Sequence, residues 1–168
     1  MYLKNLKIML LIALTLTGCS FIDRDTDKEE YKTPKEYATE QSEYIMECIV
    51  NKEKEGLKSV FSTHISETHD LDKEIDEFFQ FIDGEIVSYD EPIGREGGGV
   101  LAYGEYKEKE LYGHTENIIT DTGKKYHVSF MMYQIYETNP DYVGVDLITV
   151  TDKTSIEDGE RKYIGLDR

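Results

Sequence analysis

The hydrophobic positions of the chain follow two different periods, one before and one after Gly84. Between residues 33 and 82, apolar residues recur every three or four positions, the spacing that places them on one face of a helix. Beyond Gly84, apolar and polar residues alternate in several segments, as in strands with one buried face. The pattern therefore predicts helices first and then a run of antiparallel strands.

Three helices are expected before Gly84. The first follows Thr33-Pro34-Lys35-Glu36, which has the form of a capping box with proline in the first turn. The residues that follow helical spacing along one face of it are Tyr37, Gln41, Tyr44, Ile45, Cys48 and Ile49. A short second helix carries Leu57, Val60 and Phe61, and the polar segment SETHD (66–70) is interpreted as a loop. Asp70 is the expected N-cap of the third helix, whose apolar face is the most regular in the chain.

Strands are expected at 85–89, 100–107, 112–120, 125–136 and 142–151. The segment 125–136 is apolar on both faces, which places it in the middle of a sheet. The glycine-rich EPIGREGGG (91–99) is interpreted as a flexible loop, because it lacks the lysine and Ser/Thr of a phosphate loop. In YVGVD (142–146) and YIGLD (163–167), the glycine is expected where the chain bends or another backbone approaches. Helices followed by antiparallel strands predict an α+β fold with the helices on one sheet face.

The N-terminal segment predicts where in the cell the protein is located. Lys4 and Lys7 precede the apolar run 8–16, whose nine residues span only about 14 Å as a helix, too short to cross a bilayer. This is the form of a signal peptide. The run ends in Leu16-Thr17-Gly18-Cys19, which resembles the lipobox of bacterial lipoproteins.

That resemblance implies cleavage between Gly18 and Cys19 and a diacylglyceryl group on Cys19, a lipid anchor that holds the chain at the cell membrane, facing outside the cytoplasm. The alternative is an ordinary signal peptide, or an uncleaved anchor, with Cys19 incidental. The expected organisation is a signal peptide (1–18), a lipidated cysteine and flexible tether (19–32), and one α+β domain (33–168).

The net charge of the chain restricts its possible partners, and its two cysteines restrict its thiol chemistry. The chain carries a formal charge of −16, and removal of Lys4 and Lys7 with the signal peptide takes it to −18. Such a chain is repelled by nucleic acid and by anionic headgroups, so no nucleic-acid partner is expected. Cys48 is then the only cysteine besides Cys19, and its place on a helical stripe predicts a buried, unreactive thiol.

The layout of helices and then long strands resembles the nuclear transport factor 2-like (cystatin-like) fold, in which a curved antiparallel sheet packs on N-terminal helices. The lipobox together with GLKSVFS, EIDEFFQFIDGEIVSYD and YVGVDLITV resembles a family of bacterial lipoproteins, domain of unknown function 5104. The resemblance spans about residues 35–152 and implies no activity, since the fold hosts enzymes and binding modules alike.

Two polar residues on the predicted strands are candidates for a pocket. Asp146 stands between Val145 and Leu147 and is expected to share a face with Ile148; desolvation there would suit it to proton transfer. His127 is expected on the same strand face as Ser129, Met131 and Tyr133, and therefore in the same pocket. The alternative for both is an ordinary solvated or packed position on a strand.

No metal or other cofactor is expected. His64 and His69 are five residues apart, which does not place both on one face of a helix as a zinc-binding pair requires. Three functions remain open. The first is a membrane-tethered module that binds a small molecule or a protein. The second is a small isomerase or dehydratase that uses Asp146 and His127. The third is a scaffold that dimerises through its sheet.

Overall fold

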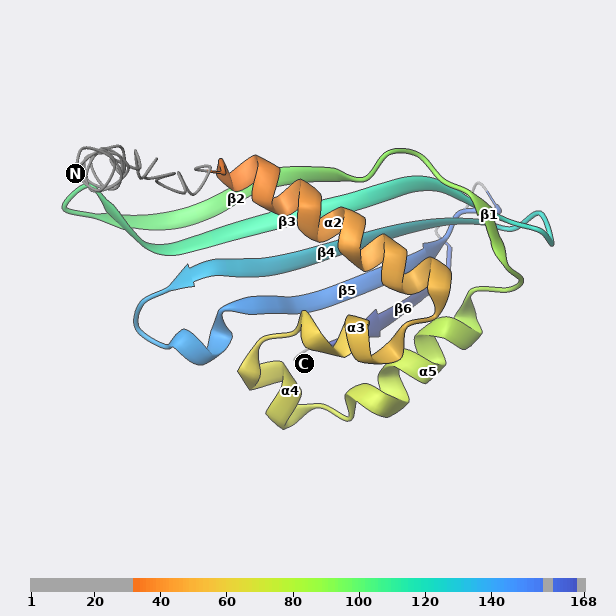
Figure 1. Ribbon diagram of the computed structural model, residues 1–168, viewed down its shortest axis with the longest axis horizontal. Helices are drawn as coiled ribbons and strands as arrows, with labels where there is room; N and C mark the ends of the chain where they lie inside the picture. The colour runs from red at the N-terminus through yellow and green to blue at the C-terminus, as the bar shows by residue number, and fades with distance from the viewer. Residues whose placement is uncertain (1–31, 156–158, 166–168) are drawn as a thin grey trace, which may run out of the picture. The chain divides into compact units, whose positions relative to one another are not determined.

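The computed structural model describes residues 32–155 and 159–165 (Figure 1). The predicted signal peptide, the predicted cleavage position at Gly18 and the predicted lipid-attachment residue Cys19 lie outside these residues. Within the described part of the chain, none of the helices combines the length and the apolar character needed to span a bilayer.

The described chain begins with the helices α2 (Pro34–Asn51), α3 (Lys54–Ser59), α4 (Thr63–Thr68) and α5 (Leu71–Phe81). The predicted capping box is present at the start of α2: the Thr33 hydroxyl accepts from the Glu36 amide at 3.2 Å, and the Glu36 carboxylate accepts from the Thr33 amide at 2.7 Å. The predicted N-cap of α5 is also confirmed, since the Asp70 carboxylate accepts from the Lys73 amide.

One helix was not predicted. The segment 66–70, expected to be a loop, belongs in part to α4, which is only six residues long. The hydroxyl of Ser62 caps this helix by accepting from the Ile65 amide. This helix of fewer than two turns buries one apolar side chain, Ile65, and that is too little to produce a visible period in the sequence.

Six antiparallel strands form one curved, open sheet: β1 (Ile86–Ser88), β2 (Ile93–Ala102), β3 (Glu105–Thr120), β4 (Lys125–Tyr136), β5 (Gly144–Asp152) and β6 (Arg161–Ile164). The order is β1-β3-β4-β5-β6, and β2 pairs with the same edge of β3 as β1 does, farther along that strand. β4 lies in the middle, as its two apolar faces predict.

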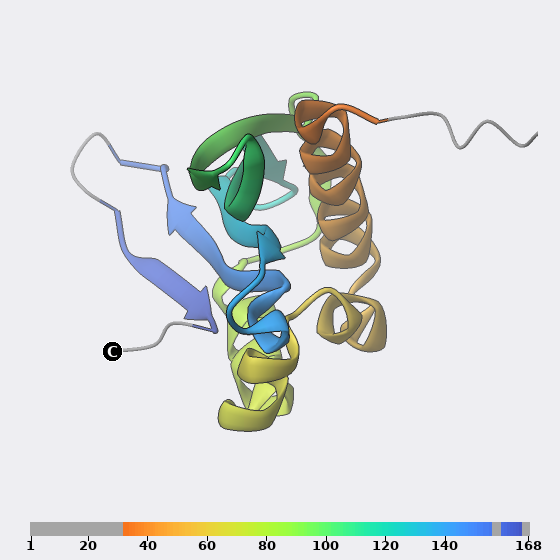
Figure 2. The same ribbon diagram turned by 90° about the vertical axis from the view of Figure 1, so that its left-hand side faces the viewer.

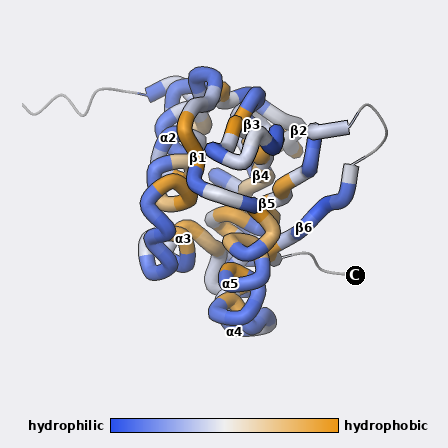
Figure 3. Tube along the Cα trace, turned by 90° about the vertical axis from the view of Figure 1, so that its right-hand side faces the viewer, coloured by the Kyte–Doolittle hydropathy of each residue, from blue (hydrophilic) through white to orange (hydrophobic). Residues whose placement is uncertain are grey.

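The helices cover one face of the sheet, and the core lies between the two layers (Figures 1 and 2). Hydrophobic positions of helices and strands gather there (Figure 3). The core residues of the sheet are Leu111, Ile118, Tyr126, Val128, Phe130, Met132, Val145, Ile148, Val150 and Ile164. Cys48 is buried in this core, as expected from its place on the α2 stripe. The α+β class and its likeness to the nuclear transport factor 2-like fold are confirmed.

The prediction of a flexible loop at 91–99 is wrong, because most of this segment belongs to β2. Two of its glycines, Gly94 and Gly97, make room for close neighbours. A Cβ atom on Gly94 would lie 2.1 Å from the backbone nitrogen of Thr39 in α2, and one on Gly97 would lie 2.3 Å from the ring of Tyr112. Gly94 and Gly97 are required because β2 runs against α2 and against an aromatic ring.

The glycines of the two related pentapeptides behave as predicted. Gly144 and Gly165 both have positive φ angles, 130° and 81°. A Cβ atom on Gly144 would lie 2.8 Å from the Cα of Ser62, and one on Gly165 would lie 2.4 Å from the Asp146 carbonyl oxygen. Both positions combine a bend with a close backbone approach, which only glycine tolerates.

Candidate functional site

The face of the sheet that turns away from the helices carries the candidate site. Along β3 and β4, core residues alternate with residues that point to this open face, as the pleat requires. Strand pairing then brings the open-face residues together, with Tyr112 opposite Met131 and His114 opposite Ser129.

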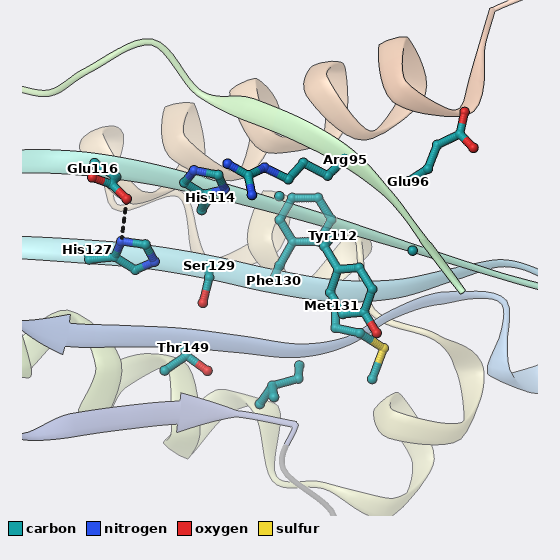
Figure 4. Close-up of a pocket in the computed structure, with 13 residues that line it drawn as sticks. Arg95, Glu96, Tyr112, His114, Glu116, His127, Ser129, Phe130, Met131 and Thr149 are labelled. Atoms are coloured by element: carbon teal, nitrogen blue, oxygen red, sulfur yellow. Dashed lines mark ion pairs between the residues drawn. The ribbon is translucent and has the colours of Figure 1, made fainter. Parts of the chain in front are cut away.

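Two adjoining hollows, of about 660 and 840 Å³, lie on the open face and share Glu116, His127, Ser129, Leu147 and Thr149. We call the joined hollow the open-face trough. Its first part is lined by residues of β2, β3, β4 and β5, among them Arg95, Tyr112, His114 and Met131 (Figure 4). Its second part reaches β6 and is lined further by Lys125, Thr151, Lys153, Arg161 and Tyr163.

Two histidines lie side by side in the trough. The rings of His114 and His127 stack with centroids 5.8 Å apart and planes at 11°. The Nδ1 atom of His127 lies 3.8 Å from a carboxylate oxygen of Glu116 (Figure 4). Burial lowers the pKa of His127, and the nearby His114 and Lys153 lower it further, against the opposing effect of Glu116. His127 is therefore neutral at pH 7, with one nitrogen able to accept a hydrogen bond.

Tyr112 forms a wall of the trough. Its ring lies against Gly97, which has no side chain to displace it. Its hydroxyl donates to Glu110 at 2.6 Å, and this bond is the main reason that the pKa of Tyr112 rises to about 12. The hydroxyl stays protonated at any physiological pH, so Tyr112 contributes an uncharged aromatic surface.

The charge of the trough is opposite to that of the chain. The whole chain has 35 acidic and 19 basic residues. The lining of the two hollows contains four basic residues, Arg95, Lys125, Lys153 and Arg161, and only two acidic ones, Glu96 and Glu116. Glu96 is in addition paired with Lys109, at 3.1 Å. A local excess of positive charge on a strongly acidic protein favours an anionic ligand at this place.

Asp146, the other residue singled out in the sequence, does not line the trough. Met131 pairs with Leu147 and Met132 with Val145, so Asp146 is the extra residue of a β-bulge. The bulge shifts the alternation by one: Val145 and Ile148 both face the core, whereas Asp146 lies partly buried beside α4. There its carboxylate accepts a hydrogen bond from the Ser62 hydroxyl at 3.0 Å. His127 and Asp146 are thus not brought together in one hollow.

Comparison with known families adds a decisive match. The family model described as Domain of unknown function (DUF5104) matches residues 43–154, two thirds of the chain. The chain belongs to the DUF5104 family. A search of curated proteins finds no match to it. The matched region of this DUF5104 domain holds every lining residue of the trough except Arg161 and Tyr163 of β6.

The other histidines of the DUF5104 domain have structural contacts. His64 stacks on Tyr142 with ring centroids 4.2 Å apart, and the Nδ1 atom of His69 lies 3.0 Å from a carboxylate oxygen of Glu74. Over residues 32–155 and 159–165, no group of three or more His, Cys, Asp or Glu side chains is placed to hold a metal ion.

Several residues of the trough were not predicted from the sequence. Arg95 stands in the segment interpreted as a loop, and His114 and Thr149 were not singled out. The alternation of polar and apolar residues could have indicated the two histidines, because His114 and His127 each occupy an outward position on strands that follow one another in the chain. Only the register between β3 and β4 shows that the two rings meet.

Proposed function

We propose that this protein is a lipid-anchored binding module outside the cytoplasm, and that its open-face trough takes a carboxylate ligand with an apolar or aromatic part. The single observation that carries the ligand assignment is the excess of basic over acidic residues in the trough of a chain that is otherwise strongly acidic. The anchor is inferred from the signal peptide and from the Leu16-Thr17-Gly18-Cys19 motif.

The chemistry of the lining supports this ligand class. Arg95, Lys125 and Arg161 are exposed, so they can reach a carboxylate from the rim. Apolar contact comes from Met131 and Leu147 between them. Such a mixture of apolar surface and a few convergent polar groups is typical of small-ligand sites.

A binding module requires less of the trough than an enzyme does. An isomerase or dehydratase needs an acid and a base within hydrogen-bond reach of one substrate. His127 lines the trough, but the Asp146 carboxylate accepts from Ser62 instead. The binding role therefore stands as the proposal.

The anchor is tested by Cys19→Ser in the full chain expressed in a bacterium. Lipidation predicts that the parent chain is recovered with membranes and that the variant is released or remains an unprocessed precursor. A mature Cys19→Ser protein that still cofractionates with membranes would rule out the lipid anchor.

The ligand class is tested with benzoate and benzamide, which have similar size and differ in charge. Calorimetry should show millimolar binding of benzoate and much weaker binding of benzamide. Lys125→Gln should weaken benzoate binding roughly two- to fivefold, as expected for one exposed charge pair. Lys73→Gln, which removes an equal charge from the exposed face of α5, should leave it unchanged. Equal binding of the two probes, or equal effects of the two variants, would contradict the proposal.

The dimerising scaffold gives a different result in the same samples. A dimer through the open face would cover Tyr112 and the trough, so sedimentation would show a dimer and benzoate would not bind.

A further inference from the structure

The hairpin that joins β2 to β3 ends in a tight turn at one end of the molecule. Its last pair is Ala102 with Glu105, and the two residues between them, Tyr103 and Gly104, have φ angles of 55° and 86°. Positive φ at both positions defines a two-residue hairpin turn. A tyrosine in this conformation is unfavourable, and here no packing compensates for it, because Tyr103 is fully exposed at 106%.

The tip of this hairpin is apolar. Four large hydrophobic side chains are exposed there: Val100 by 50%, Leu101 by 60%, Tyr103 by 106% and Tyr106 by 41%. The segment 97–104 contains no charged residue, although 32% of the residues of the chain are charged. An exposed apolar cluster of this kind on an acidic protein marks a contact surface.

The tip lies at the same end of the domain as the start of α2 (Figure 1). Gly94 contacts Thr39 in α2, and from there β2 runs another eight residues to Ala102, about 27 Å. From Thr39 back to Pro34 is only about 8 Å of helix. The tip therefore extends roughly 20 Å beyond the first turn of α2.

The length of the chain between Cys19 and Thr33 indicates what this tip meets. Cys19 precedes Thr33 by fourteen residues, a span of at most about 50 Å. If the chain is anchored at Cys19, a connection of that length keeps the tip within reach of the bilayer. We propose that the β2–β3 hairpin tip inserts into the outer surface of the membrane that holds the lipid anchor. This inference rests on the lipid anchor of the proposed function.

The chemistry of the tip fits an interface between water and lipid. Tyrosine favours this zone, because its ring is apolar and its hydroxyl stays hydrated. Four side chains alone would bind a bilayer weakly, but the tether supplies a high effective concentration. Glu105 and Lys107 follow the turn, and the ammonium of Lys107 pairs with Glu137 at 2.9 Å and with Glu105 at 3.6 Å. The tip thus orients a domain that the lipid retains.

This orientation has a consequence for the trough. With the tip in the membrane, β3 rises from the surface, and His114 lies eleven residues from Tyr103, about 36 Å along the strand. The trough then opens sideways, clear of the headgroups and accessible to a ligand in solution.

The experiment uses the full lipidated chain, purified from membranes and reconstituted into phosphatidylcholine vesicles. The fluorophore NBD is attached to Tyr103→Cys at the tip or, as the control, to Glu91→Cys, an exposed residue before the other end of β2. Cys48 is buried and escapes labelling, and the lipid occupies Cys19. Nitroxide-labelled phosphatidylcholine then quenches any fluorophore that lies in the bilayer.

Several-fold stronger quenching at position 103 than at position 91 is expected. Leu101→Asp in the Tyr103→Cys chain should abolish most of that difference, which shows that the protein surface and not the fluorophore drives insertion. Vesicle-bound protein with equal, weak quenching at both positions would overturn the inference and leave the lipid anchor standing. Protein that never enters the vesicles would overturn both.

Discussion

Gly94→Ala is the substitution that tests most sharply how β2 and α2 are assembled. The added Cβ atom would lie 2.1 Å from the backbone nitrogen of Thr39 and 2.4 Å from the carbonyl carbon of Ala38. Both are backbone atoms inside α2, so no side chain can rotate away. To reach an ordinary contact of about 3.5 Å, strand and helix must separate by more than ~1 Å.

The cost follows from two losses and one gain. Overpacking of this kind destabilises by about 1–3 kcal/mol. Separation also weakens the hydrogen bond that the Gly94 amide donates to the Thr39 hydroxyl at 3.1 Å, which is worth about 1 kcal/mol. Alanine restricts the unfolded chain and returns about 0.4–1 kcal/mol. The free energy of unfolding should therefore fall by about 1–3.5 kcal/mol.

Gly98→Ala is the matched control on the same strand. Its Cβ atom would meet only a carboxylate oxygen of Glu110, at 3.5 Å, an ordinary contact. With no clash, only the effect on the unfolded chain remains, and the free energy of unfolding should rise by about 0.4–1 kcal/mol.

Urea unfolding followed by circular dichroism at 25 °C measures both variants against the parent chain. The expected result is a lower midpoint for Gly94→Ala and a slightly higher one for Gly98→Ala, with unchanged slopes. If residues 91–99 were instead a flexible loop, both substitutions would raise stability slightly. Equal midpoints for the two variants would therefore refute the packing of β2 on α2.

Three further predictions concern polar groups. The pKa of His127 is near 6.5 in the unfolded chain and lower in the folded one, so the unfolded chain binds more protons between those two values. The free energy of unfolding should therefore fall as the pH drops through that interval. His127→Gln should remove this part of the pH dependence, measured by unfolding from about pH 8 to 5. Ser62→Ala removes both the cap of α4 and a donor to Asp146 and should lower the free energy of unfolding in urea by about 1–2 kcal/mol, whereas a loss below ~0.5 kcal/mol would contradict the role of Ser62. Glu96→Ala removes the carboxylate that pairs with the ammonium of Lys109, whose side chain is only 4% exposed. It should lower the melting temperature more than Lys109→Met does, because that variant leaves unpaired only the half-exposed Glu96. The reverse order of melting temperatures would contradict this.

Local signals in the sequence predicted much of the fold. The capping box at Thr33, the N-cap at Asp70 and the two-sided apolar strand β4 depend on neighbours along the chain, and all three are present. The class, helices against an antiparallel sheet, follows from the change of period near Gly84.

The structure of the β2–β3 region could not be predicted from local sequence signals. The glycines of β2 signal a loop when read locally, and their reason lies in α2 and Tyr112, which are far away in sequence. The hairpin turn at Tyr103-Gly104 was missed as well, because tyrosine is not a residue that turns of this type favour.

The candidate site was predictable only in part. Alternation along β4 correctly grouped His127 with Ser129 and Met131 on one face. Asp146 was expected beside them, but the bulge in β5 breaks the alternation on which that expectation depended. A bulge depends on pairing with the neighbouring strand, so a single strand's sequence does not reveal it.

Binding of a carboxylate ligand in the open-face trough is tested most directly by chemical-shift mapping. ¹H–¹⁵N spectra of the protein would be recorded during titration with benzoate and, in parallel, with benzamide. Benzoate should shift the signals of four trough residues, His114, His127, Ser129 and Thr149, and benzamide should shift them far less. Shifts confined to other surfaces, or equal shifts with both probes, would contradict it.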